Sequence, residues 1–170
     1  MKLTVREVVI FAMLGALMFV SKVVMEFIPN VHLLGTFIVT FTITYRQKAL
    51  IPIFLYVFAN GFYEGFSPFG WLPEVYIWPI LWAIVMLLPK KIPGRVAPVV
   101  YMIVSGLHGL AFGALYAPAY ALFSGLPWNR VWLWILSGLP YDCIHAVGNF
   151  TLGILIIPLS KLLKKLSKKR

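Results

Sequence analysis

Long apolar runs alternate with brief polar segments along almost the whole chain. Runs of this length and polarity predict helices that cross a membrane, and the short polar segments between them predict tight turns. The expected spans are residues 4–27, 31–45, 49–62, 72–88, 97–122 and 131–158. We therefore predict an all-α fold, an integral membrane bundle of six transmembrane helices that forms a single membrane domain over residues 1–170.

The second run is short for a membrane helix. Residues 31–45 would extend about 22 Å as a helix, against a hydrocarbon core of about 30 Å. We expect either local thinning of the bilayer or shelter by neighbouring helices. His32, at the outer mouth of this run, is interpreted as a solvated interfacial residue.

Composition and charge indicate that this bundle lies in a membrane and predict its orientation there. Hydrophobic residues make up 61% of the chain and charged residues 12%, whereas soluble domains have roughly 45–50% and 25%. A net charge of +10 would suggest nucleic acid in a soluble protein, yet all of the 15 basic residues except Lys22 and Arg130 lie in alternate gaps or in the tail 161–170. The positive-inside rule then predicts cytoplasmic termini, with the tail on anionic lipid of the bilayer and no nucleic-acid partner.

Three polar residues stand out in the last apolar run. Asp142, His145 and Asn149 are separated by steps of three and four, which align them on one face of a helix. Burial of such groups in hydrocarbon costs several kcal/mol unless they face protein, water or a ligand. This face is the first candidate for a binding site.

The fourth and fifth runs carry stripes at helical spacing that begin near the outer side. A stripe of this kind is usually packing or lipid contact, and a histidine within the membrane can be satisfied by a neighbouring helix, so both interpretations stay open beside that of a site. Small residues next to the fifth-run stripe permit close helix contact, and Pro118 is expected to bend that span. The stripes comprise Trp71, Glu74, Trp78 and Trp82, and His108, Phe112, Tyr116 and Tyr120, with Gly109 and Gly113 as the small residues.

The outer side of the bundle is expected to be acidic and aromatic. Glu64 and Glu74 bracket an aromatic loop, which is either an interfacial belt or a lid. Lys22 and Glu26, four residues apart, can form a local ion pair. With Asp142 also on this side, the charge favours a neutral or cationic aromatic ligand over a multiply anionic one.

Catalysis has little support. The chain has neither a glycine-rich phosphate loop nor a paired-histidine zinc motif. Asp142 and His145 offer two metal ligands, but a site needs a third, from His108 or Asn149. Cys143, the single cysteine, points away from the polar face. We predict that the chain is not an enzyme and holds no metal or cofactor, so ATP hydrolysis must come from another chain.

Six short spans with both ends inside resemble the substrate-binding S component of energy-coupling factor (ECF) vitamin transporters. The resemblance also rests on a small-xxx-small pair in the first span, Ala12 and Ala16, and on the Pro-x-Asp-x-x-His-x-x-x-Asn run from Pro140 to Asn149. It covers essentially the whole chain. The chain does not match the subgroup that binds nickel or cobalt through an N-terminal Met-x-His.

The resemblance implies a prokaryotic plasma-membrane protein that works with other chains. Ala12 and Ala16 would dock on a transmembrane coupling subunit, below which two cytoplasmic ATPase subunits act, and the loaded S component would topple to release its vitamin. The vitamin would lie near the outer face among spans four to six. The expected substrate-binding residues are Glu64, Trp71, Glu74, Trp78, His108, Phe112, Tyr116, Asp142, His145 and Asn149.

The resemblance indicates a role more firmly than a substrate. A small aromatic, non-anionic vitamin or precursor is expected, with a B6 vitamer or hydroxymethylpyrimidine first, while cobalamin, a queuosine precursor and pantothenate remain open. The alternative from another class is a structural or assembly membrane protein without a small-molecule substrate, in which the polar residues only lock the helices together.

Overall fold

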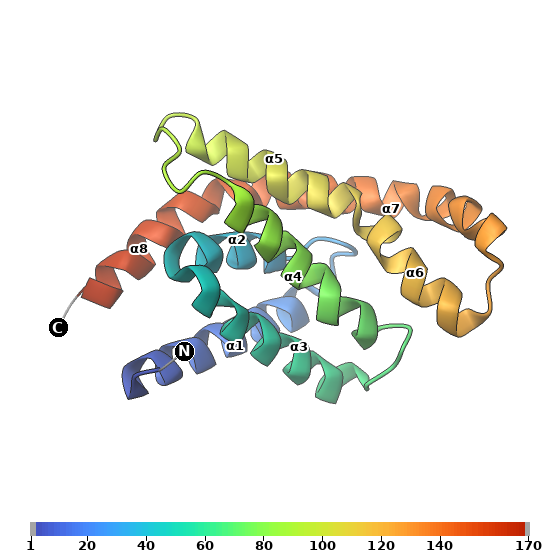
Figure 1. Cartoon of the computed structure of the whole chain (residues 1–170), viewed down its shortest axis with the longest axis horizontal. Helices are drawn as coiled ribbons and strands as arrows, with labels where there is room; N and C mark the ends of the chain where they lie inside the picture. Colours follow the sequence, from blue (N-terminus) through green and yellow to red (C-terminus); the bar gives the residue numbers. More distant parts are fainter. Residues whose placement is uncertain (1–2, 169–170) are drawn as a thin grey trace.

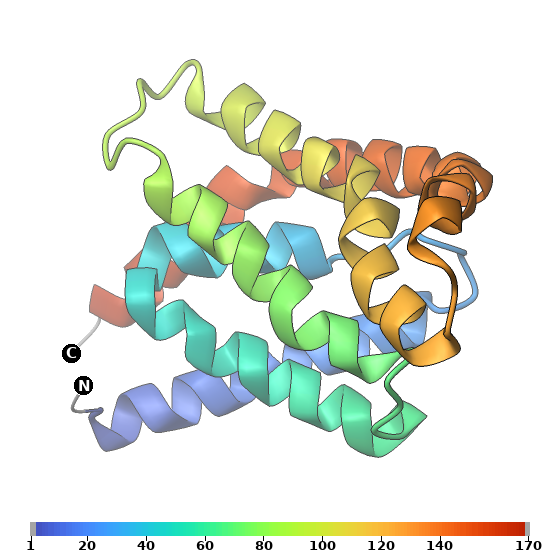
Figure 2. The same ribbon diagram turned by 45° about the vertical axis from the view of Figure 1, so that its right-hand side comes forward.

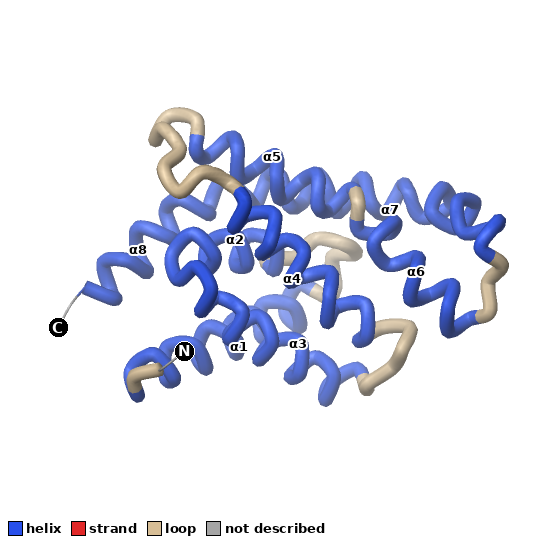
Figure 3. The backbone as a smooth tube through the Cα atoms, in the orientation of Figure 1, coloured by secondary structure: helices blue, strands red, loops and turns tan. Residues whose placement is uncertain are grey.

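The computed structural model describes residues 3–168, and over that range it consists of helices and turns without a strand, as Figures 1 and 3 show. The predicted all-α fold is confirmed. Lys2, Lys169 and Arg170 of the expected cytoplasmic segments lie outside the described residues. The helices are α1 (Val5–Met25), α2 (Leu34–Tyr45), α3 (Leu50–Glu64), α4 (Trp71–Leu87), α5 (Ala97–Leu110), α6 (Phe112–Ser124), α7 (Val131–Leu152) and α8 (Ile156–Lys168), with 3-10 turns η1 (Arg46–Ala49), η2 (Trp128–Arg130) and η3 (Gly153–Leu155).

Three stretches are long and apolar enough to cross a membrane. They are Val5–Met25, Ala97–Ser124 and Trp128–Ser167, whereas α4 is apolar but has only 17 residues. Large apolar side chains also cover much of the outer surface, including Phe62 and Leu87, which are 81% and 87% exposed. Apolar surface on this scale is compatible with a membrane protein.

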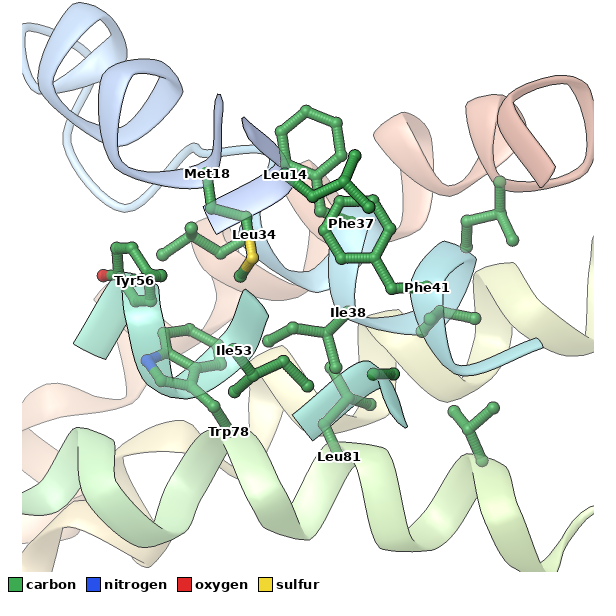
Figure 4. Close-up of a cluster of buried hydrophobic side chains, with 14 of the residues drawn as sticks. Leu14, Met18, Leu34, Phe37, Ile38, Phe41, Ile53, Tyr56, Trp78 and Leu81 are labelled. Atoms are coloured by element: carbon green, nitrogen blue, oxygen red, sulfur yellow. The ribbon is translucent and has the colours of Figure 1, made fainter. Parts of the chain in front are cut away.

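The short helix α2 lies at the centre of the bundle. Every residue from Leu34 to Thr42 is buried, because α1, α4, α5 and α8 pack around it. Figure 4 shows its side chains Phe37, Ile38 and Phe41 among residues of α1, α3 and α4. The 12-residue helix extends only about 18 Å, so shelter by its neighbours compensates for its length.

The chain ends and the turns divide between two ends of the bundle. The start of α1, η1, the loop between α4 and α5, and the end of α8 lie at one end, on the left in Figures 1 and 2. Contacts tie this end together: Arg6 Nη2 donates to the Leu166 carbonyl at 2.8 Å, and Lys48 bonds Glu7. The loops between α1 and α2, α3 and α4, and α6 and α7 lie at the opposite end (Figure 2).

The expected span 97–122 is not one continuous helix. The chain breaks at Ala111, between α5 and α6, and α6 leaves at an angle in Figure 1. Glycine is a weak helix former and Gly109 and Gly113 flank the break. The Asp142 carboxylate also accepts a hydrogen bond from the Gly113 N–H at 3.0 Å. Pro118, the expected bend, lies further on inside α6.

The last span continues further than expected. After α7 the chain passes through η3 into α8, so the basic tail from Lys161 to Lys168 is helical. At the bend, a Cβ on Gly153 would lie 3.0 Å from the Met102 Cα, which means that α5 and the end of α7 are in backbone contact. The bend redirects the basic residues of α8 toward η1 and the loop between α4 and α5.

Candidate functional site

Five rings from five segments meet near the N-terminal end of α2. His32 lies 4.7 Å from His145 and 5.8 Å from Trp78 between ring centroids. Trp78 in turn lies 5.9 Å from His108 and 5.6 Å from Phe112, and Phe112 is 4.8 Å from His145. We call these five residues the histidine–aromatic cluster. It contains all three histidines of the chain.

Close packing of α5 on α7 turns the polar face of α7 inward. A Cβ on Gly109 would lie 2.9 Å from the His145 carbonyl oxygen, and one on Gly106 would lie 3.3 Å from that of Ala146. The expectation that Gly109 permits close helix contact is therefore confirmed. Asp142, His145 and Asn149 are only 6%, 3% and 1% exposed, so this face contacts protein and not lipid.

Asn149 occupies a slot between two glycines. Its Oδ1 lies 3.1 Å from where a Cβ on Gly35 would be, and its Nδ2 lies 3.0 Å from where a Cβ on Gly109 would be. Gly35 is in the first turn of α2, which has no side-chain cap. The first N–H groups of a helix have no partner within it. The Asn149 amide therefore lies against the first turn of α2 in the interior.

Buried polar atoms without hydrogen-bond partners accumulate in and beside the cluster. His108 Nε2 lies 3.1 Å from the Ile77 carbonyl, which can only accept, so the proton is on Nε2 and Nδ1 is a free acceptor in the neutral ring. Each unpaired buried group of this kind costs about 1–3 kcal/mol. In the described part of the chain, the unpartnered atoms at this place are His32 Nδ1, Trp78 Nε1, His108 Nδ1, His145 Nε2 and both amide atoms of Asn149.

Asp142 has a different role from its neighbours on α7. Its Oδ1 accepts from the Gly113 N–H at 3.0 Å, and a Cβ on Gly113 would overlap the carboxylate. Gly113 is the second residue of α6, where backbone donors are otherwise unpaired and negative charge is favourable. Asp142 thus caps α6 from another helix and holds Phe112 against His145.

A second polar group, the carboxylate cluster, lies between α1, α3 and α4. Lys22 bonds Glu64 and lies 3.6 Å from Glu26, so the expected Lys22–Glu26 pair exists beside a closer partner. Asn60 Nδ2 donates to Glu64 at 3.2 Å and to Glu74 at 3.1 Å, and the Tyr56 hydroxyl donates to Glu74 at 3.1 Å. We define this cluster as Lys22, Glu26, Tyr56, Asn60, Glu64 and Glu74.

These contacts change the expected electrostatics of the outer side. Glu26 and Glu64 both pair with Lys22, and Glu74 accepts hydrogen bonds from two uncharged side chains. Asp142 accepts a hydrogen bond from a backbone N–H. One lysine faces two of these carboxylates, and the other two accept from neutral donors, so the four are hydrogen-bonded but are not neutralised as a group. The expectation of a neutral or cationic aromatic ligand stays a prediction.

Two other expected site residues pack near the clusters without joining the rings around Trp78. Trp71 donates from Nε1 to the Val57 carbonyl at 2.9 Å and contacts Phe66 with centroids 4.9 Å apart, so it fastens the loop between α3 and α4 onto α3. Tyr116 lies 6.1 Å from Phe112 and stacks on Trp134 at 6.2 Å. Tyr116 therefore extends the aromatic surface from Phe112 toward α7.

His32 was not expected at the site, and its interpretation as a solvated residue is wrong. The residue is half-buried, and its Nδ1 is fully buried. Its place depends on the turn between α1 and α2, in which Asn30 adopts a φ of 58°. The available sequence signal was the count of histidines, since no spacing rule connects His32 with His108 or His145.

Within residues 3–168, no group of three or more His, Cys, Asp or Glu side chains is placed to hold a metal ion. The histidine–aromatic cluster therefore offers a ligand aromatic faces and neutral hydrogen-bonding atoms.

No family model, curated protein or solved structure matches the chain.

Proposed function

We propose that the chain is the substrate-binding S component of an ECF transporter, which binds a small water-soluble vitamin or precursor and carries it across a prokaryotic plasma membrane. The observation that carries the proposal is the set of unpartnered polar atoms around Trp78, His145 and Asn149. Groups of this kind are stabilised by a ligand that supplies the missing hydrogen bonds. A coupling subunit and two cytoplasmic ATPase subunits complete the transporter.

The free atoms favour a flat ligand with both donors and acceptors at its edge. Trp78 Nε1 and Asn149 Nδ2 donate, whereas His108 Nδ1 and Asn149 Oδ1 accept. The surrounding rings offer edges and faces for stacking. B6 vitamers and hydroxymethylpyrimidine combine a nitrogen heterocycle with hydroxyl groups and so have this chemistry. Cobalamin, pantothenate and a queuosine precursor belong in the same test panel.

Ligand entry requires movement, because the five rings contact one another. His32 is the member of the histidine–aromatic cluster that lies on a connecting segment, between α1 and α2. A shift of residues 26–33 would withdraw His32 from Trp78 and His145 and open the cluster at the outer end. We propose this segment as the gate.

The arrangement of α1 supports docking of a coupling subunit. Ala12 and Ala16 are exposed, and their neighbour Met13 is 67% exposed. The inward face of α1 uses Gly15, where a Cβ would lie 2.8 Å from the Leu55 Cβ. Because Gly15 makes the close contact with α3, the Ala12 and Ala16 face is available to another chain.

The distribution of charge supports six spans with both termini in the cytoplasm. The basic residues of η1, the loop between α4 and α5, and α8 lie at the end that holds the start of α1 (Figure 1). The positive-inside rule assigns that end to the cytoplasm. The histidine–aromatic cluster then lies toward the outer side, where a vitamin arrives.

Binding measurements on the purified protein test this function. We expect one vitamin of the panel to bind with micromolar or better affinity and to raise the melting temperature. Asn149→Ala and His145→Ala should abolish binding, whereas Thr151→Ala, an exposed position on the same helix, should not. No response to any vitamin would contradict the proposal.

The alternative, a structural or assembly protein, is favoured by one observation, the direct packing of the five rings. In that case Asn149→Ala and His145→Ala would mainly lower the melting temperature, and no vitamin would change it. Comparison of binding with stability in the same variants therefore separates the two functions.

A further inference from the structure

A hollow lies at the end of the bundle opposite the histidine–aromatic cluster. Its volume is about 910 Å³, and it opens between η1, the ends of α2 and α4, the start of α5, and α8. Apolar side chains such as Ile43, Val85 and Ile157 form part of its wall. Its basic residues are Arg46, Lys48, Lys90, Lys91, Lys161 and Lys164. We call it the basic pocket.

The positive charge of the basic pocket is not balanced by the side chains of the chain. Five carboxylate side chains exist, and all lie within the described residues. Glu7 bonds Lys48, while the other four belong to the carboxylate cluster or cap α6. Arg46, Lys90, Lys91, Lys161 and Lys164 therefore converge without an acidic partner among residues 3–168.

Arg46 is fixed in position at this pocket. It is half-buried and has a φ of 56°, a conformation that is strained for a non-glycine residue. Trp82 Nε1 donates to its carbonyl at 3.1 Å, and its own Nη2 donates to the Met86 carbonyl at 3.2 Å. The surrounding helices thus hold one guanidinium in place, while the lysines around it are mostly exposed.

We propose that the basic pocket binds the headgroup of an anionic phospholipid, with a preference for a headgroup that carries two phosphates. Arginine and lysine side chains recognise phosphate by charge-assisted hydrogen bonds. The apolar wall suits the glycerol and first acyl carbons, which a free phosphate lacks. The amphipathic helix α8, with Leu162 and Leu166 exposed beside its lysines, suits the surface of a bilayer.

This inference is independent of vitamin binding, because the two sites lie at opposite ends of α2, about 18 Å apart along the helix. A bound headgroup would contact η1, the loop between α4 and α5, and α8 together. It would thereby neutralise the positive charge of three segments that otherwise repel one another.

The test measures lipid binding by native mass spectrometry and thermal stability with the full chain in detergent. Added lipids are phosphatidylcholine, phosphatidylglycerol and cardiolipin, and the soluble arms contain inorganic phosphate or pyrophosphate. We expect cardiolipin to bind at least tenfold more tightly than phosphatidylcholine, with phosphatidylglycerol between them. Full occupancy by pyrophosphate without a preference among lipids would overturn the lipid assignment, and no response to any anion would overturn the site.

A matched pair of variants separates a pocket from general attraction between charges. Lys90→Gln/Lys91→Gln/Lys161→Gln removes three exposed cations of the pocket, whereas Arg95→Gln/Arg130→Gln/Lys165→Gln removes three exposed cations outside it. We expect the first variant to lose at least fivefold in cardiolipin affinity and the second to lose less than twofold, with vitamin binding unchanged in both. Equal losses would overturn the proposal.

Discussion

The histidine–aromatic cluster and the carboxylate cluster are both polar, both partly buried and adjacent through Tyr56 and Trp78, whose rings lie 6.4 Å apart. They differ in hydrogen bonding. In the carboxylate cluster, Lys22, Tyr56 and Asn60 supply donors to all three glutamates. In the histidine–aromatic cluster, each histidine has a ring nitrogen without a partner, and so has Trp78.

We propose that this difference distinguishes a polar group that stabilises the fold from one that binds a ligand. Removal of a satisfied partner exposes a buried charge or dipole and destabilises the protein. Removal of an unsatisfied group leaves no partner behind and has little effect on stability, but it takes away a contact for a ligand. Stability and binding should therefore respond in opposite ways at the two clusters.

The largest expected effect concerns the contact between α5 and α7 on which the histidine–aromatic cluster depends. Gly109→Ala would place a Cβ 2.9 Å from the His145 carbonyl oxygen, and we expect it to destabilise the protein by about 1–3 kcal/mol through overpacking. Displacement of His145 and Asn149 should also weaken vitamin binding. Thermal unfolding in detergent and a binding titration measure the two effects.

Gly138→Ala is the matched control, because it lies in α7 with nothing within 4 Å of the added Cβ. A helix-interior alanine is more favourable than glycine by about 1 kcal/mol, so this variant should be as stable as the original protein or more so. Equal destabilisation by both substitutions would contradict the proposed α5–α7 contact.

The next largest effect compares Asn60 of the carboxylate cluster with Asn149, which lies beside the histidine–aromatic cluster. Asn60→Ala removes the shared donor of Glu64 and Glu74, and we expect a loss of about 1–3 kcal/mol in unfolding free energy. Asn149→Ala removes an amide with no partner, so the ligand-free protein should change by less than about 1 kcal/mol. Unfolding curves of both variants, recorded without ligand, provide the measurement.

Vitamin binding should show the reverse order. Asn149→Ala should abolish it, and Asn60→Ala should reduce it only slightly, because Asn60 bonds carboxylates within the protein. If Asn149→Ala proves the more destabilising of the two, the unpartnered amide has a structural role and the contrast between the clusters fails.

Local periodicity explains which of these features the sequence predicts. The steps between Asp142, His145 and Asn149 define one helical face whatever surrounds it, and the structure buries that face. Long apolar runs likewise predict the helices, since segment type depends on neighbouring residues. Long-range contacts are not encoded in this way. The break at Ala111 is fixed by Asp142, which lies 29 residues from its partner Gly113.

The partners of the charged residues are also set by long-range contacts. Spacing along one helix pairs Lys22 with Glu26, but Lys22 also bonds Glu64, 42 residues away, across α1 and α3. The place of His32 depends on a turn with an unusual backbone conformation at Asn30. Neither contact follows from spacing along one helix, so the partners of these polar residues could be identified only from the structure.

The smallest expected effect concerns Lys22, which links α1 to α3 in the carboxylate cluster. Lys22→Gln removes the pairs with Glu64 and Glu26, yet Glu26 is 52% exposed and Glu64 36% exposed at their side chains. Water and salt screen such pairs, so we expect a loss of about 1 kcal/mol or less. The loss should shrink between low and high salt, as measured by thermal unfolding.

Lys22→Gln also sharpens the comparison between the two clusters. With its cation gone, the charges of Glu64 and Glu26 are both uncompensated, and the preference for a cationic ligand over a neutral one of the same shape should increase. In the original protein we expect a weaker preference, because Lys22 compensates one of these two carboxylates. An unchanged preference would mean that Glu74 or Asp142, and not the pair with Lys22, sets the charge of the site.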